Sequence, residues 1–393
     1  MDVSVFAGFT LIYGPPGTGK TSLALRLASM LGKKILYIGM YEHKEKVAAK
    51  LDYLGLNKDM FKLYDFINIS EHEAVLEIIG DIYVRETPDV VVLDGVNYFP
   101  DDRETASAIY RIFDVPVLAV GEEPAGERPL AYMADLLVEV RQEFLRGARY
   151  RYARFLKSRL GQPPASELRF AVVRGGPVLI EPWDEGKASF RPAAPLAMRR
   201  VVFVDEVVKA LAAARQDYTR PGLLEGSRVA DFVGQGPEDA ALAAALLCDY
   251  AESAKTALVY TNKTIERFVK CDVGRSLIPV DALSDDKGLE ALMDAIGDSK
   301  VAFLYGMEQV VSRLGARRLR LVLDFLNSWR PDLAILAVFS GVEPSPRLFD
   351  MFNTVWRIEG GRAEVVKSML GWPVKHFKVE RREGAFYFVP SSI

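Results

Sequence analysis

Residues 14–21 read Gly14-Pro15-Pro16-Gly17-Thr18-Gly19-Lys20-Thr21, an order that fits the pattern G-x-x-x-x-G-K-[ST] of a phosphate-binding loop, or P-loop. Thr10 to Tyr13, just before it, are apolar and β-prone, and Lys20 to Leu31 place apolar side chains at helical spacing. In such a strand, loop and helix, the glycines let several amide N–H groups converge on phosphate oxygens. We therefore predict that Lys20 binds the β- and γ-phosphates of a nucleotide and that the Thr21 hydroxyl ligates Mg²⁺.

Apolar strands and helices continue to alternate through the first half of the chain. The pattern predicts strands at Ile35 to Ile38, Phe61 to Tyr64, Val90 to Leu93 and Val115 to Val120, and helices at Lys44 to Leu54, Glu71 to Val84 and Glu104 to Phe113. Such alternation is typical of an α/β fold with a doubly wound, mostly parallel sheet. From Leu136 to Ile180 strand follows strand across glycine turns, which predicts an antiparallel C-terminal extension of that sheet.

Two carboxylates are candidates for chemistry on the nucleotide. Asp94 ends the strand that begins at Val90, where a P-loop protein holds the acid that orients Mg²⁺. The next residue is Gly95, so the base that activates water is not the neighbour of Asp94. Glu42 follows the strand after the P-loop helix, and a carboxylate there would polarise a water in line with the γ-phosphate. The alternatives are that Asp94 caps the next helix and that Glu42 is a solvated acid beginning a charged helix.

A short stretch of the first half recurs in the second half. Residues 156–163 read LKSRLGQP and residues 366–373 read VKSMLGWP, so five of eight positions agree. The second half also opens with a strand at Arg228 to Val233, a glycine loop and a helix at Glu238 to Tyr250. This order predicts a tandem duplication, with one α/β domain over residues 1–190 and another over residues 198–393. A chance match between two α/β domains is the alternative.

The second half lacks the residues that would carry chemistry in the first. Its loop, residues 234–241, contains no Lys, Ser or Thr and places Glu238 and Asp239 where phosphates would lie, so repulsion replaces attraction. Three further positions differ between the halves: Asp94 becomes Tyr305, Glu42 becomes Asn262 and Arg159 becomes Met369. We therefore expect a pseudo-ATPase domain that keeps the fold without catalysis.

Together these residues resemble the RecA superfamily and, within it, the KaiC-like ATPases. Such proteins place a glutamate after the strand that follows the P-loop helix, which Glu42 matches. They end each domain with a Lys-x-Arg-Gly-like strand whose basic residues reach the nucleotide of the neighbouring subunit. Lys157 and Arg159 match it, with Leu160 inserted before Gly161. The resemblance implies two tandem RecA/KaiC-like domains, binding and slow hydrolysis of ATP with Mg²⁺, and a homo-oligomeric switch, by family a hexamer, in which Lys157 and Arg159 act in trans.

The composition limits the classes of partner. The chain has 393 residues, with 50 Lys and Arg against 53 Asp and Glu, so it lacks the overall positive field on which non-specific nucleic-acid binding relies. Its longest apolar runs are too short for a membrane span, and the N-terminus has no signal-peptide pattern, so we expect a cytoplasmic protein without a membrane contact. The two cysteines, Cys248 and Cys271, form no Cys-x-x-Cys pair, and we interpret them as reduced thiols.

Two other functions stay open on the residues alone. Arginines alternate with aromatic residues between Arg146 and Arg159, which would suit a DNA-dependent, recombinase-like ATPase related to RadA paralogues. An amphipathic strand at a subunit interface has the same period-2 pattern and is favoured. The third candidate is a nucleotide-stabilised scaffold with negligible turnover. ATPase rates with and without single-stranded DNA would separate the three.

Overall fold

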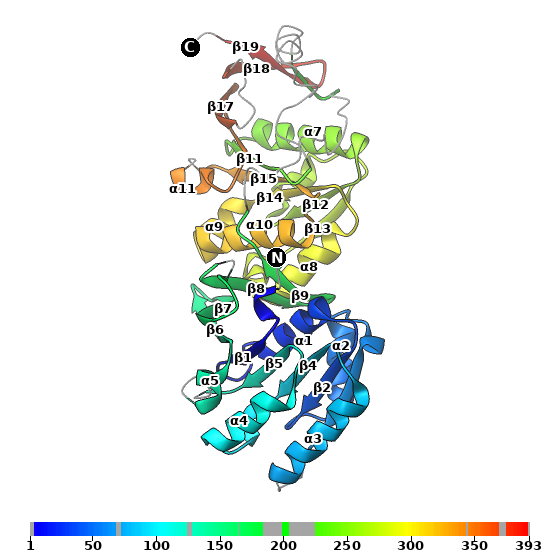
Figure 1. The fold of residues 1–393 in the computed structure, drawn as a ribbon. Coiled ribbons are helices and arrows are strands. Elements are labelled where there is room, and N and C mark those ends of the chain that lie inside the picture. Colours follow the sequence, from blue (N-terminus) through cyan, green and yellow to red (C-terminus); the bar gives the residue numbers. More distant parts are fainter. Residues whose placement is uncertain are drawn as a thin grey trace. The chain divides into compact units, whose positions relative to one another are not determined.

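The structure, a computed structural model, describes residues 4–67, 72–123, 128–163, 165–183, 199–203, 225–342, 345–368 and 375–391. The chain divides into two compact α/β units, one of residues 1–144 and 149–180 and the other of residues 145–148 and 181–393 (Figure 1). Each unit is built on one large, mainly parallel sheet. The expected domain boundary, between residues 190 and 198, lies outside the described residues.

The sheet of the first unit has the strand order β3-β2-β4-β5-β1-β6-β7-β8-β9. Neighbours from β3 to β6 run parallel, and β8 is antiparallel to both β7 and β9. The strands are β1 (Phe9–Tyr13), β2 (Ile35–Gly39), β3 (Phe61–Asp65), β4 (Val90–Asp94), β5 (Val117–Gly121), β6 (Leu136–Leu145), β7 (Ala148–Ser158), β8 (Glu167–Val173) and β9 (Gly176–Ile180). The predicted parallel sheet with an antiparallel extension is therefore present.

Helices cover both faces of this sheet. On one face, α1 (Lys20–Leu31) and α2 (Lys44–Tyr53) share an apolar cluster with Ile12. On the other, α3 (His72–Glu86), α4 (Arg103–Ile112) and α5 (Pro129–Met133) share a cluster with Leu11. Leu11 and Ile12 are neighbours on β1 and point to opposite faces, so β1 is buried on both sides. Short 3₁₀ turns occupy Ser4–Phe6, Lys58–Met60 and Val96–Tyr98.

The sheet of the second unit has the order β13-β12-β14-β15-β11-β16-β17-β18-β19-β10. Its strands are β10 (Val201–Phe203), β11 (Arg228–Val233), β12 (Thr256–Tyr260), β13 (Gly274–Leu277), β14 (Val301–Tyr305), β15 (Ala334–Ser340), β16 (Thr354–Glu359), β17 (Arg362–Ser368), β18 (His376–Arg382) and β19 (Ala385–Pro390). In Figure 1, α7 (Pro237–Ser253) lies on one side of this sheet, and α8 (Asp286–Ile296), α9 (Met307–Leu314) and α10 (Ala316–Trp329) lie on the other. The elements α11 (Pro346–Phe349), Lys263–Arg267 and Val280–Ser284 are single turns.

The two sheets share one strand order. When β1 of the first unit and β11 of the second are each numbered 1, the strands of both sheets follow the order 3-2-4-5-1-6-7-8-9. In the second sheet β10 is an additional edge strand. In both sheets the seventh, eighth and ninth strands are antiparallel neighbours, whereas the added β10 is parallel to β19. The repeated sequence begins each time in the last three residues of the seventh strand, and Met369 of its second copy lies outside the described residues.

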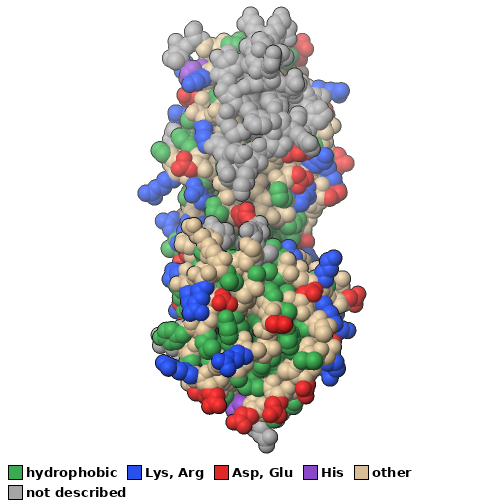
Figure 2. Space-filling view, in the orientation of Figure 1, with side chains coloured by type: hydrophobic (Ala, Val, Ile, Leu, Met, Phe, Trp, Pro, Cys, Tyr) green, Lys and Arg blue, Asp and Glu red, His purple; other side chains and the backbone are tan. Residues whose placement is uncertain are grey.

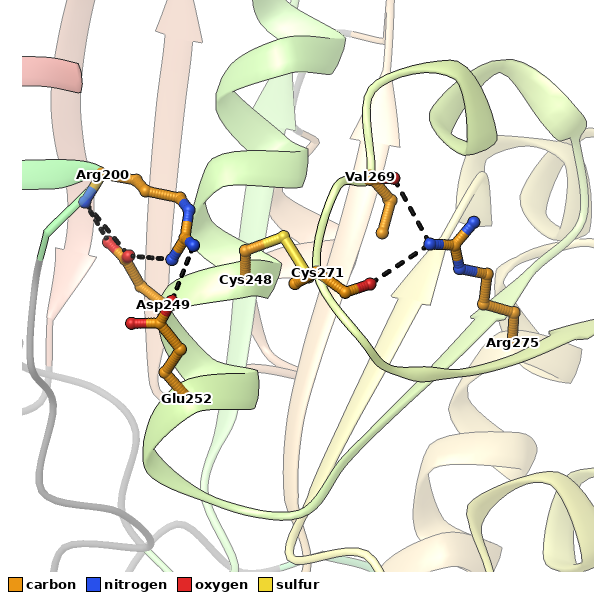
Figure 3. Close-up of a disulfide and its surroundings, with 7 residues drawn as sticks. All are labelled: Arg200, Cys248, Asp249, Glu252, Val269, Cys271 and Arg275. Atoms are coloured by element: carbon orange, nitrogen blue, oxygen red, sulfur yellow. Dashed lines mark hydrogen bonds and ion pairs between the residues drawn. A yellow bond between two sulfur atoms is a disulfide. The ribbon is translucent and has the colours of Figure 1, made fainter. Parts of the chain in front are cut away.

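The cysteines form a disulfide, so their interpretation as reduced thiols is wrong (Figure 3). Cys248 lies on α7 and Cys271 in the segment before β13, with Cα atoms 5.4 Å apart across 23 positions of sequence. Cys248 belongs to the apolar core of the unit and Cys271 packs against it. Arg275 donates hydrogen bonds to the carbonyls of Val269 and Cys271, which fixes the turn that carries Cys271 (Figure 3). The pairing depends on how this segment packs on α7, which sequence spacing does not reveal.

Candidate nucleotide site

Residues 14–19 form the loop between β1 and α1. Gly14, Gly17 and Gly19 all have positive φ, of 151°, 74° and 96°, a region that residues with a Cβ rarely adopt. A Cβ on Gly14 would also lie 2.0 Å from the carbonyl oxygen of Val140. Gly19 is the N-cap residue of α1 and has no side chain to cap the helix. The first amide N–H groups of α1 are therefore left for a ligand, and a helix N-terminus favours an anion.

Lys20 extends back into the curve of this loop. Its ammonium donates hydrogen bonds to the carbonyls of Gly14 (2.9 Å) and Pro15 (2.8 Å), and the residue is 8% exposed. The Thr18 hydroxyl also donates to Pro15, which braces the loop. Burial lowers the pKa of Lys20, while the carboxylate of Glu122 acts against this shift. The Lys20 ammonium is thus held where phosphate oxygens would compete with the carbonyls of Gly14 and Pro15 for its hydrogen bonds.

Asp94 is surrounded by hydroxyl groups at the end of β4. Its Oδ2 accepts hydrogen bonds from Thr21 of α1 and from Tyr37 of β2, each 2.9 Å long. Burial raises the pKa of Asp94, and these two hydrogen bonds act in the opposite direction. A hydroxyl beside a carboxylate presents the oxygen ligands that Mg²⁺ prefers. The predicted metal-binding pair, Thr21 and Asp94, is therefore in direct contact.

Glu42 lies just beyond the end of β2. Its Oε2 is 2.7 Å from the ammonium of Lys50 on α2, and the two side chains are 32% and 28% exposed. Gly95, which follows Asp94, has a φ of 100°, and a Cβ there would lie 2.8 Å from the ring of Tyr41. A glutamate at position 95 would be strained in its backbone and would collide with Tyr41. Because residue 95 supplies no carboxylate, Glu42 is the candidate base beside Asp94.

These residues line one cleft of about 420 Å³. It is formed by Pro16, Gly17, Gly19, Lys20, Thr21, Ser22, Tyr37, Tyr41, Glu42, Lys50, Asp94, Gly95, Val120, Gly121, Glu122, Arg151 and Val172. The carboxyl ends of β1, β2, β4 and β5 meet at this edge of the sheet, which is the usual position of a ligand site in such folds. The cleft brings together the predicted phosphate-binding, metal-binding and base residues.

Lys157 and Arg159 lie elsewhere in the first unit. Both donate to the carbonyl of Tyr132, at 2.7 and 3.0 Å. The backbone N–H of Arg159 donates to Asp135, whose own N–H donates to Phe9. Phe9 is the first residue of β1, whereas the P-loop follows its last. Within the described part of the chain, Lys157 and Arg159 therefore lie at the sheet edge opposite the cleft.

The residues of the cleft that the sequence analysis did not predict include Tyr37 and Arg151. Tyr37 is a buried tyrosine inside an apolar strand, and a buried hydroxyl needs a partner, which was a usable signal for its contact with Asp94. Arg151 was one of several arginines in the alternating stretch from Arg146 to Arg159. Nothing in that stretch distinguishes Arg151, because only the packing of β7 selects the residue that faces α1.

In the second unit, a carboxylate of the unit itself lies at the helix N-terminus that corresponds to the end of the P-loop. Only residues 234–236 connect β11 to α7, against residues 14–19 in the first unit. The Asp239 carboxylate accepts a hydrogen bond from the N–H of Gly236 at 3.0 Å, so an internal anion occupies the helix N-terminus. Tyr305 ends β14 and, like Asp94, precedes a glycine of positive φ. The loop is therefore too short for a phosphate cradle and already carries a negative charge.

Comparison with known proteins identifies the class of the first unit. Residues 10–115 match the family model for the ATPase family associated with various cellular activities (AAA). No curated protein matches the chain. The match indicates a P-loop ATPase, and it names a clade different from the RecA superfamily. Among the described residues, every helix is too short or too polar to cross a membrane.

Proposed function

We propose that the chain is a KaiC-like ATPase of the RecA superfamily, in which the first unit binds and slowly hydrolyses ATP and the second is a degenerate copy. The observation that carries the proposal is the position of Glu42, which lines one cleft with Lys20, Thr21 and Asp94 and follows β2 in the chain. A glutamate after the strand that follows the P-loop helix is the RecA-type arrangement that the sequence resembles.

The AAA match is compatible with this assignment. It covers residues 10–115, which include the P-loop, and the P-loop of this chain reads much like those of AAA+ proteins. AAA+ proteins place their water-activating glutamate directly after the acid that corresponds to Asp94, which is position 95 of this chain. This chain has Gly95 at that position, and its positive φ and the nearness of the Tyr41 ring to a Cβ built there disfavour a glutamate. The finer assignment to the KaiC-like group therefore rests on Glu42.

The P-loop and Glu42 have different roles in the proposed hydrolysis. The loop amides and Lys20 bind the β- and γ-phosphates and offset their charge. Glu42 accepts a proton from water as the water oxygen attacks the γ-phosphorus and the bond to the bridging oxygen breaks, giving ADP and phosphate. Before this step Glu42 has to leave Lys50, and an ion pair whose side chains are 32% and 28% exposed costs little to separate.

The donor set beside the P-loop fits Mg²⁺. The Thr21 hydroxyl and the Asp94 carboxylate are hard oxygen groups in contact with each other, and Tyr37 fixes the orientation of the carboxylate. When bound, Mg²⁺ would neutralise charge on the phosphates. Thr21 would ligate the ion, and Asp94 would orient its water ligands.

A tandem duplication explains the second unit. The shared strand order and the repeated stretch of residues 156–163 support descent from one ancestral domain. Asp239 at the helix N-terminus and the short connection 234–236 support loss of nucleotide binding. Its apolar core, with Leu246, Phe303 and Leu336, is fully buried, so the copy serves structure, assembly or regulation.

Lys157 and Arg159 are assigned to a neighbouring subunit's nucleotide, as the family resemblance implies. Their position at the sheet edge opposite their own cleft supports action in trans within a homo-oligomer, by family a hexamer. Arg159 would stabilise charge on the transferring phosphoryl group of the adjacent chain. The carbonyl of Tyr132 holds both side chains near one another in the single chain.

The test of the proposed function is ATP turnover by the full chain, with and without single-stranded DNA. We expect slow, Mg²⁺-dependent hydrolysis that DNA does not change. On the face drawn in Figure 2, the coloured Lys and Arg side chains lie among Asp and Glu side chains on both units, and a mixed surface of this kind does not attract a polyanion. Stimulation by DNA would favour the recombinase-like alternative, and binding without turnover would favour the scaffold.

A further inference from the structure

Arg151 of β7 enters the nucleotide cleft of its own chain. It is 9% exposed and lines the cleft together with Gly19 and Val172. A Cβ built at Gly19 would lie 3.7 Å from Cδ of Arg151 and 3.2 Å from Cγ2 of Val172. The aliphatic stem of Arg151 therefore lies beside the end of the P-loop, where α1 begins.

The side of β7 that carries Arg151 faces α1. Ala153 and Phe155 pack with the apolar cluster that includes α1. Residues two apart on a strand point to the same face, so Arg151 continues this row toward the P-loop. Arg154 belongs to the other face and lies 3.5 Å from Glu139 on β6. Of these two arginines on β7, the packing directs one into the cleft and the other away from it.

The strand order separates Arg151 from the hydrolytic residues. Glu42 follows β2, which is three strand positions from β1, and Asp94 ends β4, which is two positions away on the same side. Arg151 comes from β7, two positions from β1 on the other side. With about 4.8 Å between neighbouring strands, Glu42 and Arg151 stand roughly 14 and 10 Å to opposite sides of the P-loop strand. The γ-phosphate end of a nucleotide belongs beside Asp94 and Glu42.

We propose that Arg151 binds the phosphates that are not transferred, the α- and β-phosphates of the nucleotide held in its own cleft. The inference rests on the proposed function of the first unit. A guanidinium presents paired N–H donors that match phosphate oxygens, and here it adds a cation to a cleft that also contains Glu42, Asp94 and Glu122. This contact exists equally in bound ADP, bound ATP and the transition state, so it strengthens binding without accelerating hydrolysis.

The experiment compares Arg151→Met with Arg154→Met. Methionine keeps an aliphatic stem beside Gly19, and Arg154→Met removes a cation from the same strand outside the cleft. Dissociation constants of ADP and of a non-hydrolysable ATP analogue are measured with Mg²⁺, together with kcat at saturating ATP. Arg151→Met should weaken both ligands by the same factor, about tenfold or more, with kcat unchanged. Arg154→Met should change neither by more than about twofold.

Several outcomes would overturn the inference. An unchanged affinity in Arg151→Met would place Arg151 outside the nucleotide contacts. Loss of ATP-analogue affinity alone, or a loss of kcat, would assign it to the γ-phosphate. The melting temperature without nucleotide checks that Arg151→Met is folded. Arg151→Lys is a second variant, which keeps the charge. A wild-type chain that binds no nucleotide would overturn the proposed function itself, whereas normal wild-type binding with an unaffected Arg151→Met would overturn this inference alone.

Discussion

Replacing Glu42 by Gln removes the proposed base while keeping the shape of the side chain. A general base typically contributes 10²–10⁴-fold to a rate. We therefore expect the activation free energy of hydrolysis to rise by about 3–5 kcal/mol. ATP affinity should barely change. Glu42 forms an ion pair with Lys50, and the two side chains are 32% and 28% exposed. Such pairs contribute about 0–1 kcal/mol, so loss of this pair should change ATP affinity by less than about fivefold.

Single-turnover hydrolysis and the dissociation constant of ATP, measured on the same preparations, separate the two effects. Lys50→Met is the matched control, because it breaks the ion pair with Glu42 but leaves the carboxylate in the cleft. We expect its rate to stay within about fivefold of the wild type. A wild-type rate in Glu42→Gln would refute the role of Glu42 and direct attention to Glu122 or Glu123, just after β5. Equal losses in Glu42→Gln and Lys50→Met would mean that the pair acts as a unit.

Three further predictions concern other parts of the molecule. Arg159→Ala should lower ATPase activity in the assembled protein. Mixing this variant with Lys20→Ala should restore part of the activity, through interfaces that combine an intact P-loop with an intact arginine. Absence of recovery after subunit exchange would exclude action in trans. Asp94→Asn should abolish Mg²⁺-dependent hydrolysis yet raise the melting temperature without nucleotide. Burial raises the pKa of Asp94 above its unfolded value, so ionisation destabilises the fold as pH rises above about 3.9, and the gain should be present at pH 7 and vanish near pH 4. Reducing the disulfide between Cys248 and Cys271, which closes a loop of 23 positions, should lower the unfolding free energy of the second unit by about 3 kcal/mol, and a Cys248→Ala, Cys271→Ala variant should not respond to reductant.

The nucleotide site was largely predictable because its chemistry is local. A P-loop offers phosphate its own backbone amides, so the order of residues 14–21 in the sequence is sufficient to locate the loop. Asp94 and Glu42 each follow an apolar strand that the alternating pattern made visible. Parallel strands share one edge for their carboxyl ends, so residues that follow such strands lie near the P-loop.

The remaining features depend on tertiary packing. The alternating pattern from Arg146 to Arg159 indicates a strand but not which of its faces meets α1, so Arg151 was not singled out. The disulfide joins α7 to a segment without regular structure, and its two cysteines are too far apart in sequence to indicate contact. In the second unit, the sequence revealed acids at the P-loop position, but only the short connection 234–236 explains how Asp239 reaches the N–H of Gly236.

The most direct test of one active unit beside one degenerate copy is the number of nucleotides bound per chain. Titration calorimetry with Mg²⁺ and a non-hydrolysable ATP analogue should give one site for the wild type and none for Lys20→Ala. An equally folded Lys20→Ala protein, judged by its melting temperature without nucleotide, makes the comparison valid. Two equivalent sites per chain, or a single site that survives Lys20→Ala, would contradict the account.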